Sequence, residues 1–259
     1  MDGIEGLLLD IDGVLTVSWR ALPGAIETVE WLRGRGLPFR LITNTTTHTR
    51  ADLAATLAST GIAVEAEEIV TAVVATASYL RDHRPGARVF VLSEGNARAD
   101  LEGISLVEEG ADVVVLGGAY EGFTYEALNR AFRMLMDGAE LVGMHRNLYW
   151  RTADGWQLDG GAFIAGLEEA TGRRAVVCGK PAAAYFDSAL STMGVRPERA
   201  AMVGDDVVND VLGAQAVGLT GVLVRTGKFR AEDLERAPGV PDHVIDDIGS
   251  LPELLERLS

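Results

Sequence analysis

The sequence predicts an α/β protein built on a mostly parallel β-sheet with helices on both faces. Three observations support this fold class. Short apolar runs alternate with amphipathic stretches along most of the 259 residues. The apolar runs are nearly continuous, as expected for strands that are buried on both faces. Polar clusters follow several of these runs, at the strand ends where open α/β sheets carry their chemistry.

The elements can be placed in order along the chain. The first strand, at 7–9, ends in the polar turn Asp10-Ile11-Asp12-Gly13, and Pro23-Gly24 then opens a helix that ends near Gly34. Further strands are predicted from apolar runs at 39–43, 88–92, 112–116, 141–144, 175–178, 200–203 and 221–224. Further helices are predicted from the spacing of apolar residues at 49–59, 72–81, 125–136, 160–170, 182–193 and 209–217.

Composition narrows the class of partner. The chain carries 23 basic and 38 acidic side chains, a formal net charge of −15, which argues against nucleic acid as the main partner. No apolar run is long enough to span a bilayer and no signal-peptide pattern is present, so we expect a cytoplasmic protein without a membrane partner. The single cysteine, Cys178, excludes an internal disulfide and a cysteine-based zinc cluster. It lies in an apolar run and is interpreted as a core residue.

The turn after the first strand carries the strongest chemical signal. Asp10 and Asp12 are two residues apart, so in an extended chain both project to the same side. Gly13 lets the chain turn away at once. Two neighbouring carboxylates are costly unless a cation or a proton offsets their repulsion. The pattern therefore predicts a divalent-metal site in which one aspartate is also a nucleophile.

Three more polar clusters follow strand-like runs: Thr43-Asn44, then Lys180, then Asp205-Asp206 with Asp210 one helical turn later. If these strands are parallel neighbours, all four clusters meet at one edge of the sheet. The set suits phosphoryl transfer. Carboxylate and phosphate oxygens bind Mg²⁺, while lysine and hydroxyl donors stabilise the phosphoryl oxygens. An aspartate can form an aspartyl phosphate.

Simpler interpretations exist for several of these residues. The first aspartate pair alone could be an ordinary strand-end turn, and Lys180 alone could be a surface residue. Thr46 and Thr47 could serve only to cap the following helix. Gly179-Lys180-Pro181 is not a phosphate-binding P-loop, because proline stands where serine or threonine is needed. Three aromatic side chains of the middle third could either pack in a core or contact the substrate: Tyr149, Trp150 and Trp156.

Taken together and in this order, the four motifs resemble the haloacid dehalogenase (HAD)-like hydrolase superfamily. They read Asp-x-Asp-Gly-Val-Leu from Asp10, Thr-Asn-Thr-Thr from Thr43, Gly-Lys-Pro from Gly179 and Gly-Asp-Asp-x-x-x-Asp from Gly204. The long insertion after Thr43 resembles the NagD-type branch.

Further stretches resemble the group that contains phospholysine phosphohistidine inorganic pyrophosphate phosphatase. They are Asn129-Arg130-Ala131-Phe132, Tyr149-Trp150, Gly204–Asp210 and Arg225-Thr226-Gly227-Lys228-Phe229-Arg230. The resemblance implies a Rossmann-like HAD core at 1–77 and 177–259, with an inserted α/β cap domain (C2 type) at 78–176.

The resemblance also implies residue roles. Asp10 is the nucleophile and a Mg²⁺ ligand, and Asp12 is the general acid and base and gives its main-chain carbonyl to the metal. Asp205 is the third metal ligand. The implied phosphate-binding residues are Ile11, Asp12, Gly13, Thr43, Asn44, Thr45 and Lys180. Asp206 and Asp210 are expected to orient the metal side of the site.

The predicted function is hydrolysis of a small phosphorylated compound. Two alternatives stay open. A phosphotransferase or phosphomutase can use the same core. A phospho-receiver domain also surrounds a phosphorylated aspartate with acidic residues, a hydroxyl and a lysine, but there the acidic pair precedes the nucleophile in the chain. The cap resemblance also suggests a homodimer.

Overall fold

The computed structural model describes residues 3–152 and 155–258 and divides the chain into two compact units. The first combines 1–43, 50–70 and 180–259, and the second combines 44–49 and 71–179. Both ends of the chain therefore belong to the first unit, and most of the second unit is one continuous insertion. The boundary expected after residue 77 lies within a helix, α3 (Ala72–His83), that belongs to the second unit.

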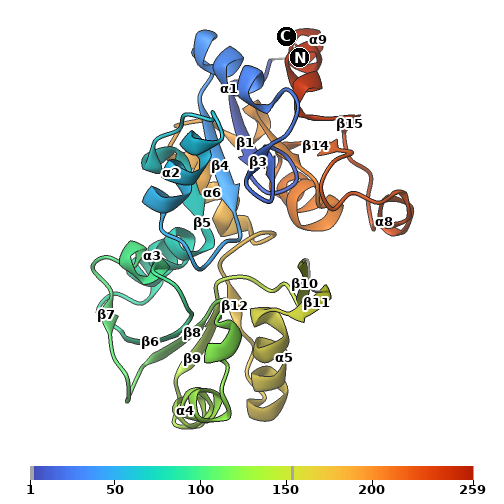
Figure 1. Ribbon diagram of the computed structural model, residues 1–259. Coiled ribbons are helices and arrows are strands. Elements are labelled where there is room, and N and C mark those ends of the chain that lie inside the picture. The colour runs from blue at the N-terminus through green and yellow to red at the C-terminus, as the bar shows by residue number, and fades with distance from the viewer. Residues whose placement is uncertain (1–2, 153–154, 259) are drawn as a thin grey trace. The chain divides into compact units, whose positions relative to one another are not determined.

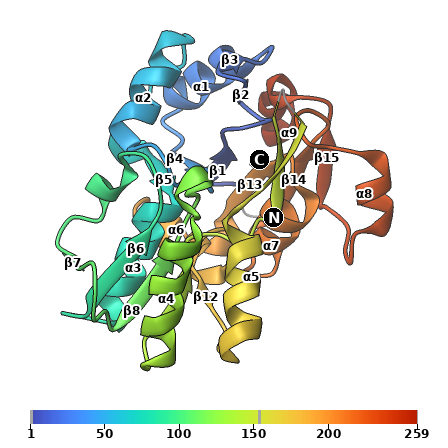
Figure 2. The ribbon, with the colours of Figure 1, turned by 60° about the horizontal axis from the view of Figure 1, so that its bottom comes forward.

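The first unit is organised by a six-stranded sheet in the order β15-β14-β13-β1-β4-β5 (Figures 1 and 2). The pairs from β15 to β4 are parallel. The strands are β1 (Gly6–Asp10), β4 (Phe39–Thr43), β5 (Ile69–Thr71), β13 (Ala200–Gly204), β14 (Thr220–Val224) and β15 (His243–Ile245). A small antiparallel hairpin, β2 (Thr16–Val17) and β3 (Arg20–Ala21), follows β1.

Alternate residues of β1 serve different faces of the sheet. Leu7 and Leu9 join one apolar cluster with side chains from three helices, α1 (Ala25–Gly34), α2 (Arg50–Ser59) and α9 (Leu251–Leu258). The remaining helices of this unit are α6 (Ala183–Ser191), α7 (Gly213–Gln215) and α8 (Ala231–Arg236). Because β1 is fully buried along its length, its carboxyl end is held rigidly within the sheet.

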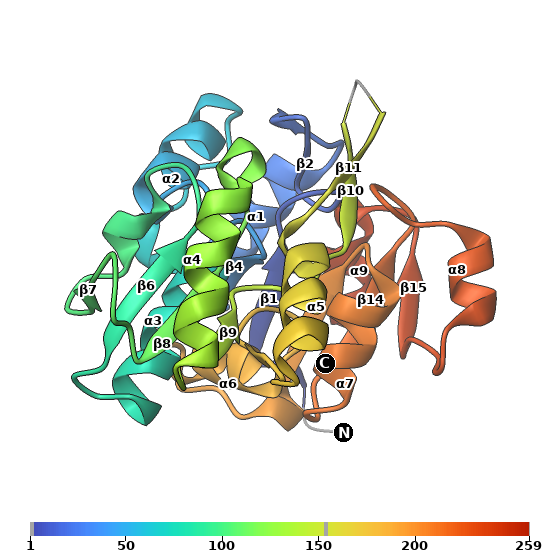
Figure 3. The same cartoon turned by 90° about the horizontal axis from the view of Figure 1, so that it is seen from below.

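The second unit has its own five-stranded parallel sheet in the order β12-β9-β8-β6-β7. The strands are β6 (Arg88–Leu92), β7 (Ser105–Leu106), β8 (Val113–Leu116), β9 (Glu140–Gly143) and β12 (Val176–Val177). On β8, Val113 and Val115 pack with α3, whereas Val114 and Leu116 pack with α4 (Tyr125–Met136) and α5 (Gly160–Thr171). Figure 3 shows α4 and α5 on this face. A hairpin of β10 (Tyr149–Thr152) and β11 (Gly155–Leu158) precedes α5.

The structure adds elements that were not predicted: β2, β3, β5, β7, the β10–β11 hairpin, α8, β15 and α9. It also changes two details. The strand before Lys180, β12, pairs with β9 in the second sheet, so it is not a neighbour of β1. The helix expected at 209–217 begins as a π-helix at Val207–Leu212. Within the described residues, no helix combines the length and apolar character that a membrane crossing requires.

Candidate active site

Two aspartates meet at the carboxyl ends of neighbouring strands in the first unit. Asp10 is the last residue of β1, and Asp205 directly follows β13. The two strands are paired in parallel, with Leu9 opposite Val203, so both chains reach the same edge together. Both side chains are buried, at 4% and 2% relative exposure. The sheet thus brings two carboxylates together out of water, an arrangement that needs compensating charge.

Lys180 supplies that charge. Its Nζ lies 2.7 Å from Asp10 Oδ1 and 2.7 Å from Asp210 Oδ1, and the lysine is itself 4% exposed. Burial alone would lower the pKa of Lys180, but the two carboxylates hold it well above the usual range. Lys180 is therefore a charged, buried partner of two aspartates. The strand before Lys180 belongs to the second sheet. The prediction that Lys180 follows a neighbour of β1 is therefore wrong, although Lys180 does lie beside Asp10.

Asp210 is held in place by the π-helix. Its Oδ2 accepts a hydrogen bond from the Asp206 N–H at 3.2 Å, while Oδ1 contacts the lysine. A Cβ at Gly204 would lie 2.2 Å from Asp210 Cβ, so only glycine allows this close approach. Asp206 has a different task. Its side chain accepts from the main-chain N–H groups of Val208 and Asn209 and so caps the π-helix.

The three carboxylates form a group with metal-ligand geometry. One oxygen each of Asp10, Asp205 and Asp210 lie within 4.8 Å of one another. Burial raises the pKa of Asp205 to about 8 and that of Asp210 to about 6, and the charge of Asp10 adds to both effects. Asp205 Oδ1 is buried and has no hydrogen-bond partner within the described part of the chain. An all-oxygen donor set with one such oxygen fits a hard divalent cation.

Asp12 differs from these three carboxylates. Its side chain is exposed, and it lies outside the group of three. Desolvation nevertheless raises the pKa of Asp12, while Lys228 and Lys180 oppose the shift. An accessible carboxyl with a raised pKa can carry a proton to a bound ligand and take one back.

Thr43 ends β4, which pairs with β1 on the side opposite β13. It is 3% exposed, and its N–H donates to the hydroxyl of Tyr185 at 2.9 Å. That hydroxyl donates in turn to the Val70 carbonyl at 2.6 Å. Sequence reasoning missed Tyr185 because it occupies an apolar position of a predicted helix, where a tyrosine is indistinguishable from a core residue.

The residues after Thr43 belong to the second unit. Asn44 and Thr45 lie in the segment 44–49, and Asn44 Oδ1 packs against Gly179. Their phosphate-binding role stays a prediction. Thr46 is not a helix cap: its hydroxyl accepts from the Gly118 N–H at 2.8 Å, and α2 begins only at residue 50. This segment is therefore tied to the second sheet.

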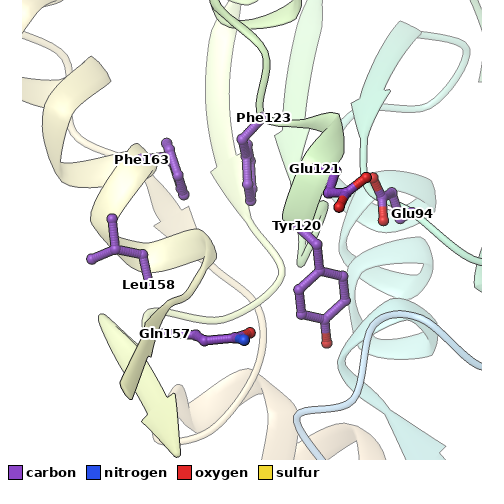
Figure 4. Close-up of a pocket in the computed structure, with 7 residues that line it drawn as sticks. All are labelled: Glu94, Tyr120, Glu121, Phe123, Gln157, Leu158 and Phe163. Carbon is purple, nitrogen blue, oxygen red and sulfur yellow. The ribbon is translucent and has the colours of Figure 1, made fainter. Parts of the chain in front are cut away.

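The second unit contains a cavity of about 590 Å³ (Figure 4). Its lining residues are Glu94, Tyr120, Glu121, Phe123, Gln157, Leu158 and Phe163. Phe123 and Phe163 stack with their ring centroids 3.9 Å apart and form one wall. Figure 4 shows the carboxylates of Glu94 and Glu121 close to each other, with the Gln157 side chain directed toward Tyr120. The volume and the mixed lining suit a small organic molecule.

Tyr149, at the start of β10, is 62% exposed, so the core-packing interpretation is wrong for this residue. The side chains of Trp150 and Trp156 lie outside the described part.

Sequence reasoning also left the segment Thr226–Lys228 without a role. The Lys228 N–H donates to Asp205 Oδ2 at 2.6 Å, and the Thr226 hydroxyl donates to the Gly13 carbonyl at 2.5 Å. The signal was available, because this segment follows β14 just as the other polar clusters follow their strands.

The fold and the buried carboxylate–lysine cluster define a hydrolase of the HAD class. Family models agree: a model described as haloacid dehalogenase-like hydrolase matches 7–106, and one described as HAD-hydrolase-like matches 177–251. The chain belongs to the haloacid dehalogenase-like hydrolases, and its similarities fall in the NagD-type branch of that family.

Two curated relatives illustrate this membership. Haloacid dehalogenase-like hydrolase domain-containing protein 2 of Homo sapiens is 39% identical over 252 residues, covering 95% of this chain and 96% of the relative. Phospholysine phosphohistidine inorganic pyrophosphate phosphatase of Xenopus laevis is 35% identical over 261 residues, covering 98% and 95%.

Solved structures agree with the fold. A 4-nitrophenylphosphatase from Thermotoga maritima is 32% identical with a TM-score of 0.91, covering 96% of this chain and 97% of its own. NagD from E. coli K-12 is 28% identical with a TM-score of 0.88, covering 96% and 98%. The expected family, fold class and assignment as a HAD-type phosphatase are therefore confirmed.

Proposed function

We propose that this chain is a Mg²⁺-dependent phosphatase that hydrolyses small phosphorylated compounds through an aspartyl phosphate on Asp10. One observation carries the proposal. Lys180 holds Asp10 Oδ1 at 2.7 Å, beside a group of three carboxylates that includes a buried oxygen of Asp205 with no hydrogen-bond partner among the described residues. A nucleophilic oxygen, a fixed ammonium group and an oxygen-rich cation site are the parts that phosphoryl transfer needs.

The first step divides the work between the two aspartates of the first turn. A carboxylate oxygen of Asp10 attacks phosphorus, and the bond from phosphorus to the leaving oxygen breaks. Asp12 gives its proton to that oxygen, which leaves as an alcohol or its equivalent. Lys180 remains positively charged and stabilises the phosphoryl oxygens. Protonated Asp12 suits this role because its pKa is raised.

In the second step, Asp12 takes a proton from water, and the resulting oxygen attacks the phosphorus of the aspartyl phosphate. The acyl phosphate bond then breaks, which releases inorganic phosphate and restores the Asp10 carboxylate. Asp10, Asp205 and the main-chain carbonyl of Asp12 would hold the Mg²⁺. When bound, the ion neutralises charge on the transferring group. Asp206 and Asp210 orient this side of the site.

The decisive experiment is a phosphate-release screen over phosphorylated metabolites, performed with Mg²⁺, with EDTA and with Mg²⁺ restored. We expect EDTA to abolish turnover and Mg²⁺ to restore it. Ca²⁺ should substitute poorly, because it is larger and tolerates looser coordination. Full turnover in metal-free buffer would remove the metal from the mechanism.

A phosphotransferase on the same core is the second candidate. It requires an aspartyl phosphate that survives until an acceptor alcohol arrives. Adding acceptors to the same assay separates the two functions. Hydrolysis yields one free phosphate for each substrate consumed, whereas transfer yields a new phosphoester and less free phosphate.

The substrate class is wide at this stage and includes sugar phosphates, nucleotides, pyrophosphate, phosphoamidates and aryl phosphates. We propose that the second unit acts as a cap that selects among them through its cavity and through the β10–β11 hairpin. We also propose a cytoplasmic enzyme that forms a homodimer through this unit. Light scattering of the purified chain, with and without substitutions on exposed second-unit positions, tests the dimer.

A further inference from the structure

The segment Thr226–Lys228 lies against the nucleophile turn. The Thr226 hydroxyl donates to the Gly13 carbonyl at 2.5 Å. A Cβ at Gly227 would lie 2.4 Å from Gly13 Cα and 2.1 Å from Asp205 Oδ2. Both glycines have positive φ, 88° and 61°. The two loops therefore touch backbone to backbone, and any side chain at either glycine would force them apart.

The same segment fixes the orientation of Asp205. The Lys228 N–H donates to Asp205 Oδ2 at 2.6 Å. The other oxygen, Oδ1, is left buried and without a hydrogen-bond partner among the described residues. One carboxylate oxygen of Asp205 is thus satisfied by the protein, and the second can bind a cation.

The ammonium group of Lys228 is available to a ligand. Its side chain is exposed, and it makes no direct ion pair within 3–152 and 155–258. A lysine side chain is charged at neutral pH, and the carboxylates of Asp205, Asp10 and Asp210 act on this charge. Among the ammonium groups that lower the pKa of Asp12, Lys228 acts more strongly than Lys180.

The charge balance of the site indicates that the Lys228 ammonium group favours anion binding. With Asp12 protonated, the carboxylates of Asp10, Asp205 and Asp210 are balanced by two ammonium groups and one divalent cation, and the loaded site keeps one positive charge. Without Lys228 the loaded site would be neutral and would attract a phosphate dianion less strongly. Lys180 shares its charge with Asp10 and Asp210, so a second ammonium group adds to the attraction of the anion.

We propose that Thr226–Lys228 is a positioning segment whose main chain aligns Gly13 and Asp205 and whose Lys228 ammonium group attracts the phosphoryl anion. This inference rests on the proposed phosphatase function, because it assigns the segment to the same site. Lys228 acts on the anion, and its removal should therefore affect metal and phosphate in opposite directions.

The test replaces Lys228 and measures two affinities by titration calorimetry in phosphate-free buffer. Lys228→Met keeps the main-chain N–H and removes only the charge. We expect Mg²⁺ to bind the variant more tightly, because one repelling cation is gone. Inorganic phosphate, added to the Mg²⁺-loaded protein, should bind about tenfold more weakly, as expected for loss of one charge-assisted hydrogen bond. Lys228→Arg should restore both affinities.

Two further variants separate side-chain from main-chain effects. Arg225→Met removes an exposed cation of the same loop that pairs with Asp246 at 2.8 Å, and it should leave both affinities unchanged. Thr226→Val removes the hydroxyl that holds Gly13 and should weaken Mg²⁺ binding while Lys228 stays in place.

Other outcomes overturn the inference. If Lys228→Met leaves both affinities at the wild-type level, the lysine is an ordinary surface residue. If both affinities weaken together, its role is structural. Failure of the proposed function has a different signature: wild-type protein would release no phosphate from any compound, yet the opposite shifts in Mg²⁺ and phosphate affinity would still appear.

Discussion

The two parallel sheets of this chain share an architecture but carry different chemistry at their strand ends. In the first unit, β1 and β13 lead into Asp10 and Asp205, which are buried with Lys180. In the second unit, β6 and β9 lead into Ser93 and, one residue further on, His145, which are also buried. These four strands are mostly apolar and mostly buried. The difference therefore lies only in the residues that follow them.

The second sheet satisfies its strand ends with neutral hydrogen bonds. Ser93 Oγ lies 3.2 Å from the carbonyls of Thr46 and Gly118. Burial lowers the pKa of His145, although Asp159 opposes the shift. The Nδ1 atom of His145 accepts from the Asn147 N–H at 3.2 Å, which places the proton on Nε2.

The comparison shows where buried charge is tolerated. In the first unit each charge has an opposite partner or an expected cation, so the desolvation cost of burial is offset. In the second unit the Arg88–Asp112 pair is exposed, and the buried carboxylate of Glu168 is paired with Arg146. The first sheet thus gathers buried carboxylates and a lysine at its strand ends, whereas the buried side chains Ser93 and His145 follow strands of the second sheet.

The largest expected effect comes from the strand end of β1. Asp10→Asn should form no phosphoenzyme with any substrate, because the attacking carboxylate has lost its charge. Ser93→Ala, at a strand end of the second sheet, should keep most of the turnover. Intact-protein mass after rapid quench with 4-nitrophenyl phosphate gives the readout. Phosphate retained on Asp10→Asn would move the nucleophile elsewhere, and loss of turnover in Ser93→Ala would break the contrast between the sheets.

Asp12→Ala separates the roles of the two aspartates in the turn after β1. The variant keeps the nucleophile but lacks the acid and the base, each worth roughly 10²–10⁴-fold. An aryl phosphate has a good leaving group that needs little protonation, so phosphorylation should survive better than hydrolysis. Quenched protein should then carry phosphate on Asp10. If neither aspartate variant ever shows phosphate, direct attack by water becomes the better mechanism.

Lys180→Met should give the next largest effect. Turnover should fall on the order of a hundredfold or more, as for loss of one preorganised donor. Removing one member of a buried charge group also costs about 3–5 kcal/mol of stability. Arg88→Met is the matched control, since its ion pair with Asp112 has side chains that are 56% and 49% exposed, and little change is expected. Equal effects on urea unfolding in the two variants would contradict the assignment of Lys180 to a buried cluster.

The charged cluster also predicts how stability depends on pH. Folding raises the pKa of Asp205 from 3.8 to about 8, so the folded state favours its neutral form. Its stabilising contribution is complete below the unfolded value and is lost as pH rises through about 8. The melting temperature of metal-free protein should therefore fall between pH 5 and pH 9. Each kcal/mol lost corresponds to about 2–4 °C for a chain of this size.

Two controls sharpen the pH prediction. Asp205→Asn should flatten the profile, and added Mg²⁺ should raise the melting temperature at pH 8. The second unit should respond in the opposite direction. The Arg146 side chain lowers the pKa of Glu168 below 4.5, so the stabilising contribution of this ion pair is present at neutral pH and is lost as pH falls through the lowered pKa. A metal-free melting temperature that rises between pH 5 and pH 9 would contradict the buried carboxylate cluster.

Much of this arrangement could be predicted from the sequence because it depends on local pattern. The apolar run before Asp10 and the alternation of strands and helices identify the fold class, and strand-end logic identifies Asp205. The route to Lys180 could not be predicted, because pairing of Val176–Val177 with the second sheet depends on tertiary contacts. The same holds for Thr46, whose hydroxyl reaches Gly118 across 72 residues.

Other features escaped because their signal is weak. The short β5 follows a stretch with no clear period, and the two strands of the β10–β11 hairpin mix apolar and polar residues. Tyr185 looks like any core residue until its hydroxyl is seen between Thr43 and Val70. In contrast, Thr226–Lys228 follows a predicted strand and could have been found by the reasoning that found Asp205.

The smallest expected effect concerns the second unit and its proposed role in substrate choice. Tyr149→Ala removes a side chain that is 62% exposed, so stability should hardly change. Glu94→Gln removes a carboxylate from the cavity and keeps its shape. Each variant should shift the ratio of kcat/KM between an aryl and an aliphatic phosphate by about tenfold, the scale of a single pocket contact. The Mg²⁺ requirement should stay as in the wild type, because the carboxylate cluster belongs wholly to the first unit. A uniform loss of activity on all substrates, together with a lower melting temperature, would assign these residues to packing and would leave substrate choice to the first unit.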